Sequence, residues 1–265
     1  TSALLVSFYA INVKKDDVII MPAINFVASY NMAKKLGAKI FLADVDKYTG
    51  QMNYQNIINC IKKFKLKKIK AIITMHLGGY PEHSEEIFSI KKKYKCFIVE
   101  DACHAFGAKY DYKKKKLPVG SCLHSDITTF SFHPVKGVTT GEGGAITTNN
   151  LKLYNKICLL INHGIIRKKN HWNYDVVLNG FNFRLSEINC SLGLSQLNKL
   201  ASFIAYRKKI YSYYKRKLKS YEELIKIPKY KIKNISSHHL MVISMNFERL
   251  KSNRNTFFKY MLKNK

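Results

Sequence analysis

The stretch Ser131-Phe132-His133-Pro134-Val135-Lys136, followed by Gly141-Glu142-Gly143-Gly144, is the part of this chain that decides its interpretation. It places a serine hydroxyl five residues before a lysine. The glycine-rich turn that follows lets the backbone pass close to a bound group. Upstream, the apolar run 96–99 ends in two carboxylates, Glu100 and Asp101.

A lysine, a buried acid and a phosphate-holding serine are the groups that a pyridoxal 5′-phosphate (PLP) enzyme needs. In such enzymes the lysine holds the cofactor as a Schiff base, and the acid partners the pyridinium nitrogen. The sequence therefore predicts a PLP site built from Lys136, Asp101 and Ser131, with Lys136 and Asp101 buried.

Apolar runs alternate with helical patterns along the first 150 residues. Strands are expected at 18–21, 39–42, 71–74, 96–99, 127–131 and 144–147, and helices at 2–12, 27–36, 53–65 and 83–95. Continuously apolar strands separated by helices predict an α/β fold with a parallel sheet that is covered on both faces. From Leu185 onward the pattern is mostly helical, and 237–246 is expected to be a strand of a second domain. The predicted domains are a large one over 1–195 and the start of a smaller one over 196–265.

Three candidate residues follow strands of this sheet. Asp101 comes after the run 96–99, Ser131 ends the run 127–131, and Phe26 lies in the loop after the run 18–21. Ligands of open α/β sheets bind beyond the carboxyl ends of the strands. We therefore expect these three side chains to converge.

The formal net charge of +29 raises the alternative of a nucleic-acid-binding protein. The lysines are spread along the chain, and no helix-turn-helix, zinc-finger or RNA-recognition pattern is present. Solvated helix faces explain the charge more simply, so no nucleic-acid partner is predicted. A positive field would also attract anionic, phosphate-bearing substrates.

The remaining composition points to a globular intracellular protein. Six cysteines without a C-x-x-C pair predict reduced core thiols and a cytoplasmic location. No metal site is predicted, since the histidines form no ligand pattern, and no apolar run is long enough to span a membrane. The chain begins at Thr1 without a methionine, and helical patterns reach both ends. We therefore expect a fragment that lacks both ends of its parent.

Several linked motifs, in order, give the chain a resemblance to one family. They are Thr1–Leu4, Asn25–Ala28, Glu100–Ala108, Ser131–Gly144, Asn162–Gly164 and Gly180–Glu187. The chain resembles the DegT/DnrJ/StrS sugar aminotransferases, which share the aspartate aminotransferase fold type I. Within the family it is most similar to transaminases that act on UDP-4-keto-6-deoxy-N-acetylhexosamines in the pseudaminic acid pathway.

The resemblance implies a PLP-dependent fold type I, with a mostly parallel sheet and a smaller C-terminal domain. It also implies site residues. The implied catalytic residues are Lys136, Asp101 and His133. The implied cofactor-binding residues are Thr1, Ser2, Phe26, Asp101, His104, Ser131, Lys136 and Arg184. Thr1 and Ser2 match a phosphate-binding helix start, although the glycine that precedes it in relatives is absent here. Arg184 resembles a residue that a partner subunit supplies to the phosphate, which implies a homodimer with shared sites.

Each of these residues also has a plain structural interpretation. Lys136 could be a surface lysine, Asp101 a helix cap with Glu100 as the competing acid, and Ser131 a strand-end hydroxyl. Phe26 and His104 could be core residues, and Arg184 could belong to a surface ion pair.

The implied reaction is a two-step transamination. L-glutamate first gives its amino group to the cofactor, which then aminates the C4 ketone of a nucleotide-linked sugar for surface glycan biosynthesis. Four alternatives stay open: another nucleotide-sugar aminotransferase such as a perosamine synthase, a related dehydratase, a basic nucleic-acid-binding protein and an inactive fragment. The dehydratases replace the Schiff-base lysine with histidine, so Lys136 argues against them.

Overall fold

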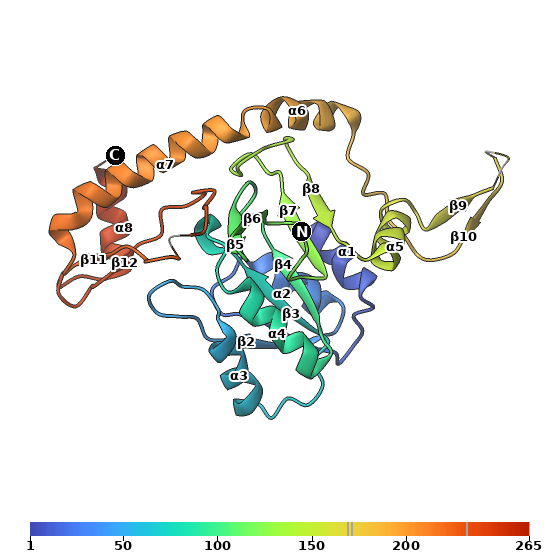
Figure 1. Ribbon diagram of the computed structural model, residues 1–265, viewed down its shortest axis with the longest axis horizontal. Helices are drawn as coiled ribbons and strands as arrows, with labels where there is room; N and C mark the ends of the chain where they lie inside the picture. The colour runs from blue at the N-terminus through green and yellow to red at the C-terminus, as the bar shows by residue number, and fades with distance from the viewer. Residues whose placement is uncertain (169, 171, 232, 265) are drawn as a thin grey trace.

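The computed structural model describes residues 1–265 except 169, 171, 232 and 265. Its centre is a six-stranded sheet of order β2-β1-β3-β4-β7-β8 (Figure 1). The strands are β1 Val18–Pro22, β2 Lys39–Ala43, β3 Ala71–Met75, β4 Phe97–Asp101, β7 Ile127–Ser131 and β8 Gly144–Thr147. The first five pair in parallel, and β8 pairs antiparallel to β7. The predicted α/β fold with a mostly parallel sheet is confirmed.

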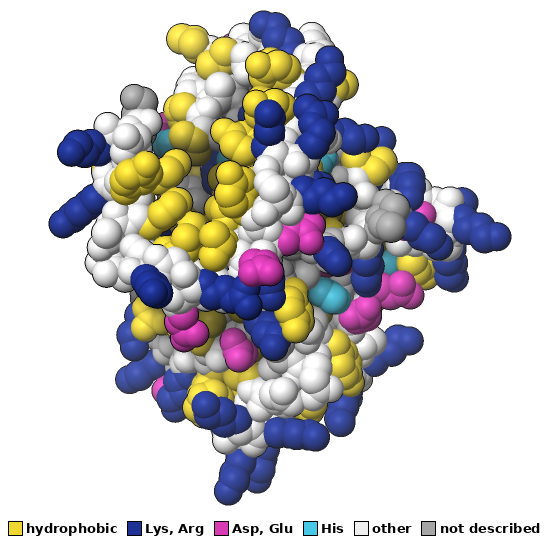
Figure 2. Space-filling view, turned by 90° about the vertical axis from the view of Figure 1, so that its left-hand side faces the viewer, with side chains coloured by type: hydrophobic (Ala, Val, Ile, Leu, Met, Phe, Trp, Pro, Cys, Tyr) yellow, Lys and Arg dark blue, Asp and Glu magenta, His cyan; other side chains and the backbone are white. Residues whose placement is uncertain are grey.

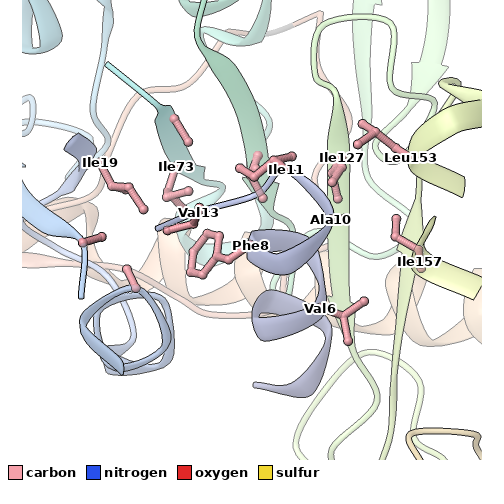
Figure 3. Close-up of a cluster of buried hydrophobic side chains, with 14 of the residues drawn as sticks. Val6, Phe8, Ala10, Ile11, Val13, Ile19, Ile73, Ile127, Leu153 and Ile157 are labelled. Carbon is pink, nitrogen blue, oxygen red and sulfur yellow. The ribbon is translucent and has the colours of Figure 1, made fainter. Parts of the chain in front are cut away.

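Alternate strand residues fill two separate cores, one on each face of the sheet. Ile19, Ile73 and Val99 face a core shared with helices α1 Ser2–Ala10, α2 Val27–Lys35 and α5 Leu151–Ile161 (Figure 3). Ile20 and Ile72 face the opposite core, shared with helices α3 Tyr54–Lys63 and α4 Ser84–Tyr94. This alternation follows from the two-residue period of a strand, and it explains why these strands carry apolar residues on both of their faces.

Smaller elements surround the sheet. They are the 3₁₀ turn η1 Leu77–Gly79, the hairpin β5 Lys109–Tyr112 with β6 Lys115–Pro118, and the hairpin β9 Ile165–Arg167 with β10 Tyr174–Val176. Asn53 and Asn150 directly precede helices α3 and α5, and their side chains accept hydrogen bonds from first-turn backbone N–H groups. This is the usual role of asparagine before a helix.

The C-terminal part is dominated by helices that cross above the sheet in Figure 1. Its elements are α6 Glu187–Leu197, α7 Leu200–Lys217, η2 Leu218–Tyr221, β11 Ile225–Lys226, β12 Ser244–Met245 and α8 Arg254–Lys263. None of the residues described in α6, α7 and α8 is buried. The predicted boundary at 195 falls inside α6. No helix in the described part of the chain combines the length and the apolar character that crossing a bilayer requires.

The predicted strand over 237–246 is wrong for most of its length. Only Ser244–Met245 is a strand, paired with β11. The backbone of Ser237 and His239 instead donates hydrogen bonds to the carbonyl oxygens of Gly79 and Gly78. An apolar pattern cannot distinguish a strand from an extended segment that is tied to a glycine turn.

Candidate active site

The structure gathers the predicted residues at one edge of the sheet. Asp101 is the last residue of β4, Ser131 is the last residue of β7, and Phe26 precedes α2 just after β1. All three therefore lie at the carboxyl ends of parallel strands, as predicted. Asp101 lies two residues after Val99, and Ser131 lies four residues after Ile127. Each therefore points to the same face of the sheet as that residue, which is the face that packs against α1 and α2.

Asp101 is a buried carboxylate, 3% exposed. Its Oδ2 accepts a hydrogen bond from Ser29 Oγ of α2 at 3.3 Å, and its Oδ1 accepts one from the backbone N–H of Cys103 at 3.1 Å. The Ser29 bond ties the carboxylate to α2, the helix that Phe26 precedes, and the Cys103 bond ties it to the loop after β4. Its burial is as predicted.

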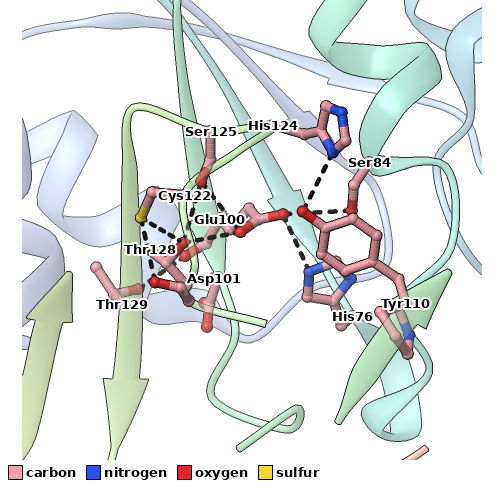
Figure 4. Close-up of polar contacts among 12 residues, drawn as sticks. His76, Ser84, Glu100, Asp101, Tyr110, Cys122, His124, Ser125, Thr128 and Thr129 are labelled. Carbon is pink, nitrogen blue, oxygen red and sulfur yellow. Dashed lines mark hydrogen bonds and ion pairs between the residues drawn. The ribbon is translucent and has the colours of Figure 1, made fainter. Parts of the chain in front are cut away.

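Glu100, the competing acid, points into the other face of the sheet. Its carboxylate accepts hydrogen bonds from Ser84, Ser125 and Thr128, and lies 3.4 Å from His76 Nε2 (Figure 4). Burial alone would raise the pKa of Glu100, but His76 and the hydroxyl donors outweigh it and lower the pKa. Glu100 is therefore held as a buried structural anion, and Asp101 is the acid left for the site.

The start of α1 lies beside the end of β7. Gly144 pairs with Ser131, and a Cβ built on Gly144 would meet Ala3 Cβ at 3.7 Å and the Phe130 carbonyl oxygen at 2.6 Å. No side chain caps α1 at Thr1, so the first-turn N–H groups around Ser2 are not occupied by a capping side chain. Such an end binds anions through its N–H groups and the helix dipole.

Lys136 lies in the turn after β7, where its backbone N–H donates to the His133 carbonyl oxygen at 2.9 Å. Lys136 is half-buried, so the prediction that it is buried is wrong. Burial, together with the nearby Lys136 cation, lowers the pKa of His104 to about 3 and that of His239 to about 4. Both histidines are therefore neutral near pH 7.

The two histidine rings have centroids 4.4 Å apart. Two buried nitrogens here lack a hydrogen-bond partner in the described structure, His104 Nδ1 and Asn25 Nδ2. Sequence reasoning missed Asn25 and His239 as parts of the site. The polar run Ser236-Ser237-His238-His239 was the only signal for His239.

The other predicted residues, Phe26, His133 and Arg184, differ in their exposure and in their contacts. Phe26 is 67% exposed, so the core-packing alternative is wrong and its ring is free to cover a ligand. The half-exposed His133 ring lies 3.8 Å from the Glu142 carboxylate. Arg184 lies between β10 and α6, where its guanidinium donates to Asn162 Oδ1 at 2.6 Å. Within the described residues, no hydrogen bond or ion pair joins Arg184 to the rest of the site.

A family model now decides the identity of the fold. The model of the DegT/DnrJ/EryC1/StrS aminotransferase family matches residues 1–265. The chain belongs to this family. It is 38% identical over 245 residues to the UDP-4-amino-4,6-dideoxy-N-acetyl-β-L-altrosamine transaminase of Campylobacter jejuni serotype O:23/36, covering 92% of this chain and 62% of that protein. The chain thus spans less than two thirds of that relative.

Solved structures of family members have the same fold. The PLP form of a sugar aminotransferase from Streptococcus pneumoniae superposes with a TM-score of 0.85 at 27% identity, over 99% of this chain and 69% of that one. Helicobacter pylori PseC, an aminotransferase involved in pseudaminic acid biosynthesis, superposes with a TM-score of 0.79 at 30% identity, over 94% and 65% of the two chains. The fold is the PLP-dependent type I of this family.

PLP is the cofactor of the DegT/DnrJ/EryC1/StrS aminotransferases, and the residues of this chain fit it. The buried Asp101, the partnerless His104 Nδ1 and the exposed Phe26 ring suit an aromatic heterocycle. The uncapped start of α1 beside Ser131 suits a phosphate. No group of three metal-ligating side chains is found within the described residues.

Proposed function

We propose that the chain carries out PLP-dependent transamination of the C4 ketone of a nucleotide-linked 6-deoxy sugar. One observation carries this proposal. Lys136 lies near the residues that follow Asp101, including His104, and this group lies at the ligand-binding edge of a fold type I sheet. Family membership supports the reaction class. The chain contributes the part of the fold that holds these residues.

In this proposal each residue has one task toward PLP. Ser131 and the start of α1 hold the phosphate, Phe26 covers the ring, and Asp101 holds a proton at the pyridine nitrogen. When bound, PLP supplies an electron sink for the carbon that loses or gains a proton. Lys136 anchors the cofactor and moves that proton at its Nζ, which a desolvated site makes possible.

For the acceptor, we propose a UDP-linked 4-keto-6-deoxy-N-acetylhexosamine, with L-glutamate as donor. The names of the Campylobacter and Helicobacter relatives support a sugar of the pseudaminic acid type. The net charge of +29 favours an acceptor that carries a diphosphate. Lys and Arg side chains are scattered over the face in Figure 2 and form no single stripe, which favours such a small anion over a nucleic acid. A cytoplasmic location, where sugar nucleotides and reduced thiols occur, belongs to the same proposal.

The proposed assembly is a homodimer in which the partner's copy of Arg184 reaches the cofactor phosphate. Large apolar side chains of α6 stand in solvent in the single chain, with Ile188 85% and Leu194 64% exposed. Exposed apolar helix faces are typical of subunit interfaces. Arg184 lies three residues before the first residue of α6, so a second copy that packs on the start of α6 would also meet Arg184.

The substrate proposal is tested by loading the chain with the aminated cofactor and offering matched UDP- and GDP-linked 4-keto-6-deoxy sugars. Mass spectrometry of the sugar product is the readout. Amination of the UDP sugar at least tenfold faster than the GDP sugar supports the proposal. Faster amination of the GDP sugar indicates a perosamine-synthase-like enzyme, and the absence of either product contradicts the reaction itself.

The shared site is tested by complementation between Lys136→Ala and Arg184→Gln chains. Each variant alone should be inactive. Mixed and re-associated at equal amounts, they should regain about a quarter of the wild-type sites, because one site of each hybrid dimer has both native residues. No recovery in a preparation that light scattering shows to be dimeric would refute the sharing of Arg184.

A further inference from the structure

A cavity of about 280 Å³ lies between the Lys136 turn and helices α6 and α7. Lys136 and Arg207 line it together with the polar side chains of Thr139, Gln196 and Tyr206. No aspartate or glutamate is among its described lining residues. The cavity therefore offers two cations and several hydrogen-bonding groups to a ligand, and no counter-ion of its own.

Arg207 is the group in this cavity that lacks a partner. Its Nη1 is buried without a hydrogen bond in the described structure, and a Cβ built on Gly137 would lie only 3.5 Å from it. No described carboxylate lies within 4.0 Å of the guanidinium. Burial lowers the pKa of Arg207, although an arginine keeps its charge near neutral pH. A partly desolvated cation without a counter-ion is costly, and a bound anion would remove that cost.

We propose that Arg207 binds the α-carboxylate of the amino donor, so that this cavity is the amino-acid subsite. The inference rests on the proposed transamination and adds the class of group that is recognised. A guanidinium fork matches a carboxylate with two parallel hydrogen bonds. In an α-amino acid the carboxylate and the amine share one carbon, so the carboxylate must bind close to Lys136. Arg207 packs against Gly137, the next residue.

Size and position favour a carboxylate over a phosphate at Arg207. Pockets for drug-sized ligands span about 300–1,000 Å³, so this cavity suits a small ligand better than a whole nucleotide sugar. The cofactor phosphate has its own place at α1 and Ser131. The anion left for Arg207 is therefore the one on the smallest substrate.

The binding test is calorimetric titration of PLP-loaded chain with glutarate, a dicarboxylate that lacks the amine and cannot react. Arg207→Gln should raise the Kd for glutarate about 10–100-fold, as loss of a charged hydrogen-bonded pair does. Arg207→Lys keeps the positive charge but loses the forked pair of donors, so its Kd for glutarate should lie between those of the wild type and Arg207→Gln. Lys208→Gln removes one charge from the neighbouring exposed position of α7 and should change Kd less than about twofold.

Kinetics provide the second readout. With Arg207→Gln the half-reaction with L-glutamate should show a higher KM, while PLP affinity and the half-reaction with the sugar nucleotide stay within about twofold. If Arg207→Gln weakens UDP and leaves glutarate unchanged, Arg207 is a phosphate ligand and the inference is wrong. If Arg207→Gln changes the Kd for glutarate no more than Lys208→Gln does, the inference is also wrong.

The inference can fail separately from the proposed function. If PLP does not attach to Lys136, the transamination proposal fails, and glutarate titration of the cofactor-free chain still tests Arg207. Circular dichroism checks that each variant folds. If Arg207→Gln is unfolded, Arg207→Lys decides the question, because a normal glutarate Kd in that variant would contradict a bidentate carboxylate site.

Discussion

Glu100 and Asp101 are consecutive residues of β4, yet their carboxylates lie on opposite faces of the sheet and bind separate sets of donors. Asp101 is held by Ser29 of α2, and Glu100 by Ser84 of α4. The two-residue period of the strand imposes this separation. Asp101 therefore lies on the face of the candidate site, and Glu100 lies in the packing on the opposite face.

Asp101→Asn should remove the charge that holds a proton on the cofactor and keep the fold. Asparagine can accept the Cys103 N–H bond with its Oδ1 and donate from its amide nitrogen to Ser29 Oγ, so the melting temperature should change little. The half-reaction with L-glutamate, followed by absorbance under single-turnover conditions, should slow about 10²–10³-fold, as loss of one preorganised electrostatic contact does. A rate within threefold of wild type would show that Asp101 does not partner the cofactor.

Glu100→Gln should lower the stability of the fold and affect the reaction rate much less. It should lower the free energy of unfolding by about 1–3 kcal/mol at pH 7, because three hydroxyl donors and His76 lose their anion. Urea denaturation measures this difference. The rate of the half-reaction per folded, PLP-bound site should fall much less than in Asp101→Asn. An equal loss of rate in both variants would overturn the division of roles.

The contribution of Glu100 should also depend on pH. Its pKa is lowered in the folded chain relative to 4.5, so its stabilisation is present above that value and is lost as pH falls toward the folded pKa. The stability difference between wild type and Glu100→Gln should therefore shrink below about pH 4.5. A difference that grew in acid would mean that the pKa is raised by burial.

Phe26→Ala should weaken PLP without weakening the fold. The ring is 67% exposed, so its loss removes little packing in the free chain. Loss of an aromatic stack should raise the Kd for PLP about 3–10-fold in a fluorescence titration. Tyr30→Ala, on the same helix and 40% exposed, is the matched control and should leave the Kd unchanged. Equal effects of the two variants would exclude stacking by Phe26.

Ser131→Ala should discriminate between PLP and pyridoxal, which lacks the phosphate. The variant should bind PLP about 10-fold more weakly, as expected for one hydrogen bond to a charged group, and bind pyridoxal as wild type does. Equilibrium dialysis of both ligands measures this. If the binding of pyridoxal weakens as much as that of PLP, Ser131 stabilises the end of the strand and does not bind the phosphate.

The sequence predicted the sheet and its ligand edge because both depend on local patterns. Apolar runs located the strands, and the ends of those runs located Asp101, Ser131 and Phe26. Contacts across long sequence distances could not be predicted in this way. The packing of His239 against His104, and of Arg207 against Gly137, joins residues that are far apart in the chain. The same limit explains the error at 237–246, where a glycine turn replaces a strand partner.

The most direct test of the account is whether PLP attaches to Lys136. The chain is incubated with PLP, its absorbance spectrum is recorded, and the complex is reduced with borohydride and digested for mass spectrometry. We predict a protein-bound band near the edge of the visible range that L-glutamate bleaches. We also predict a label on the peptide that contains Lys136, and neither signal in Lys136→Ala. A label spread over the surface lysines, or a band that persists in Lys136→Ala, would contradict the account.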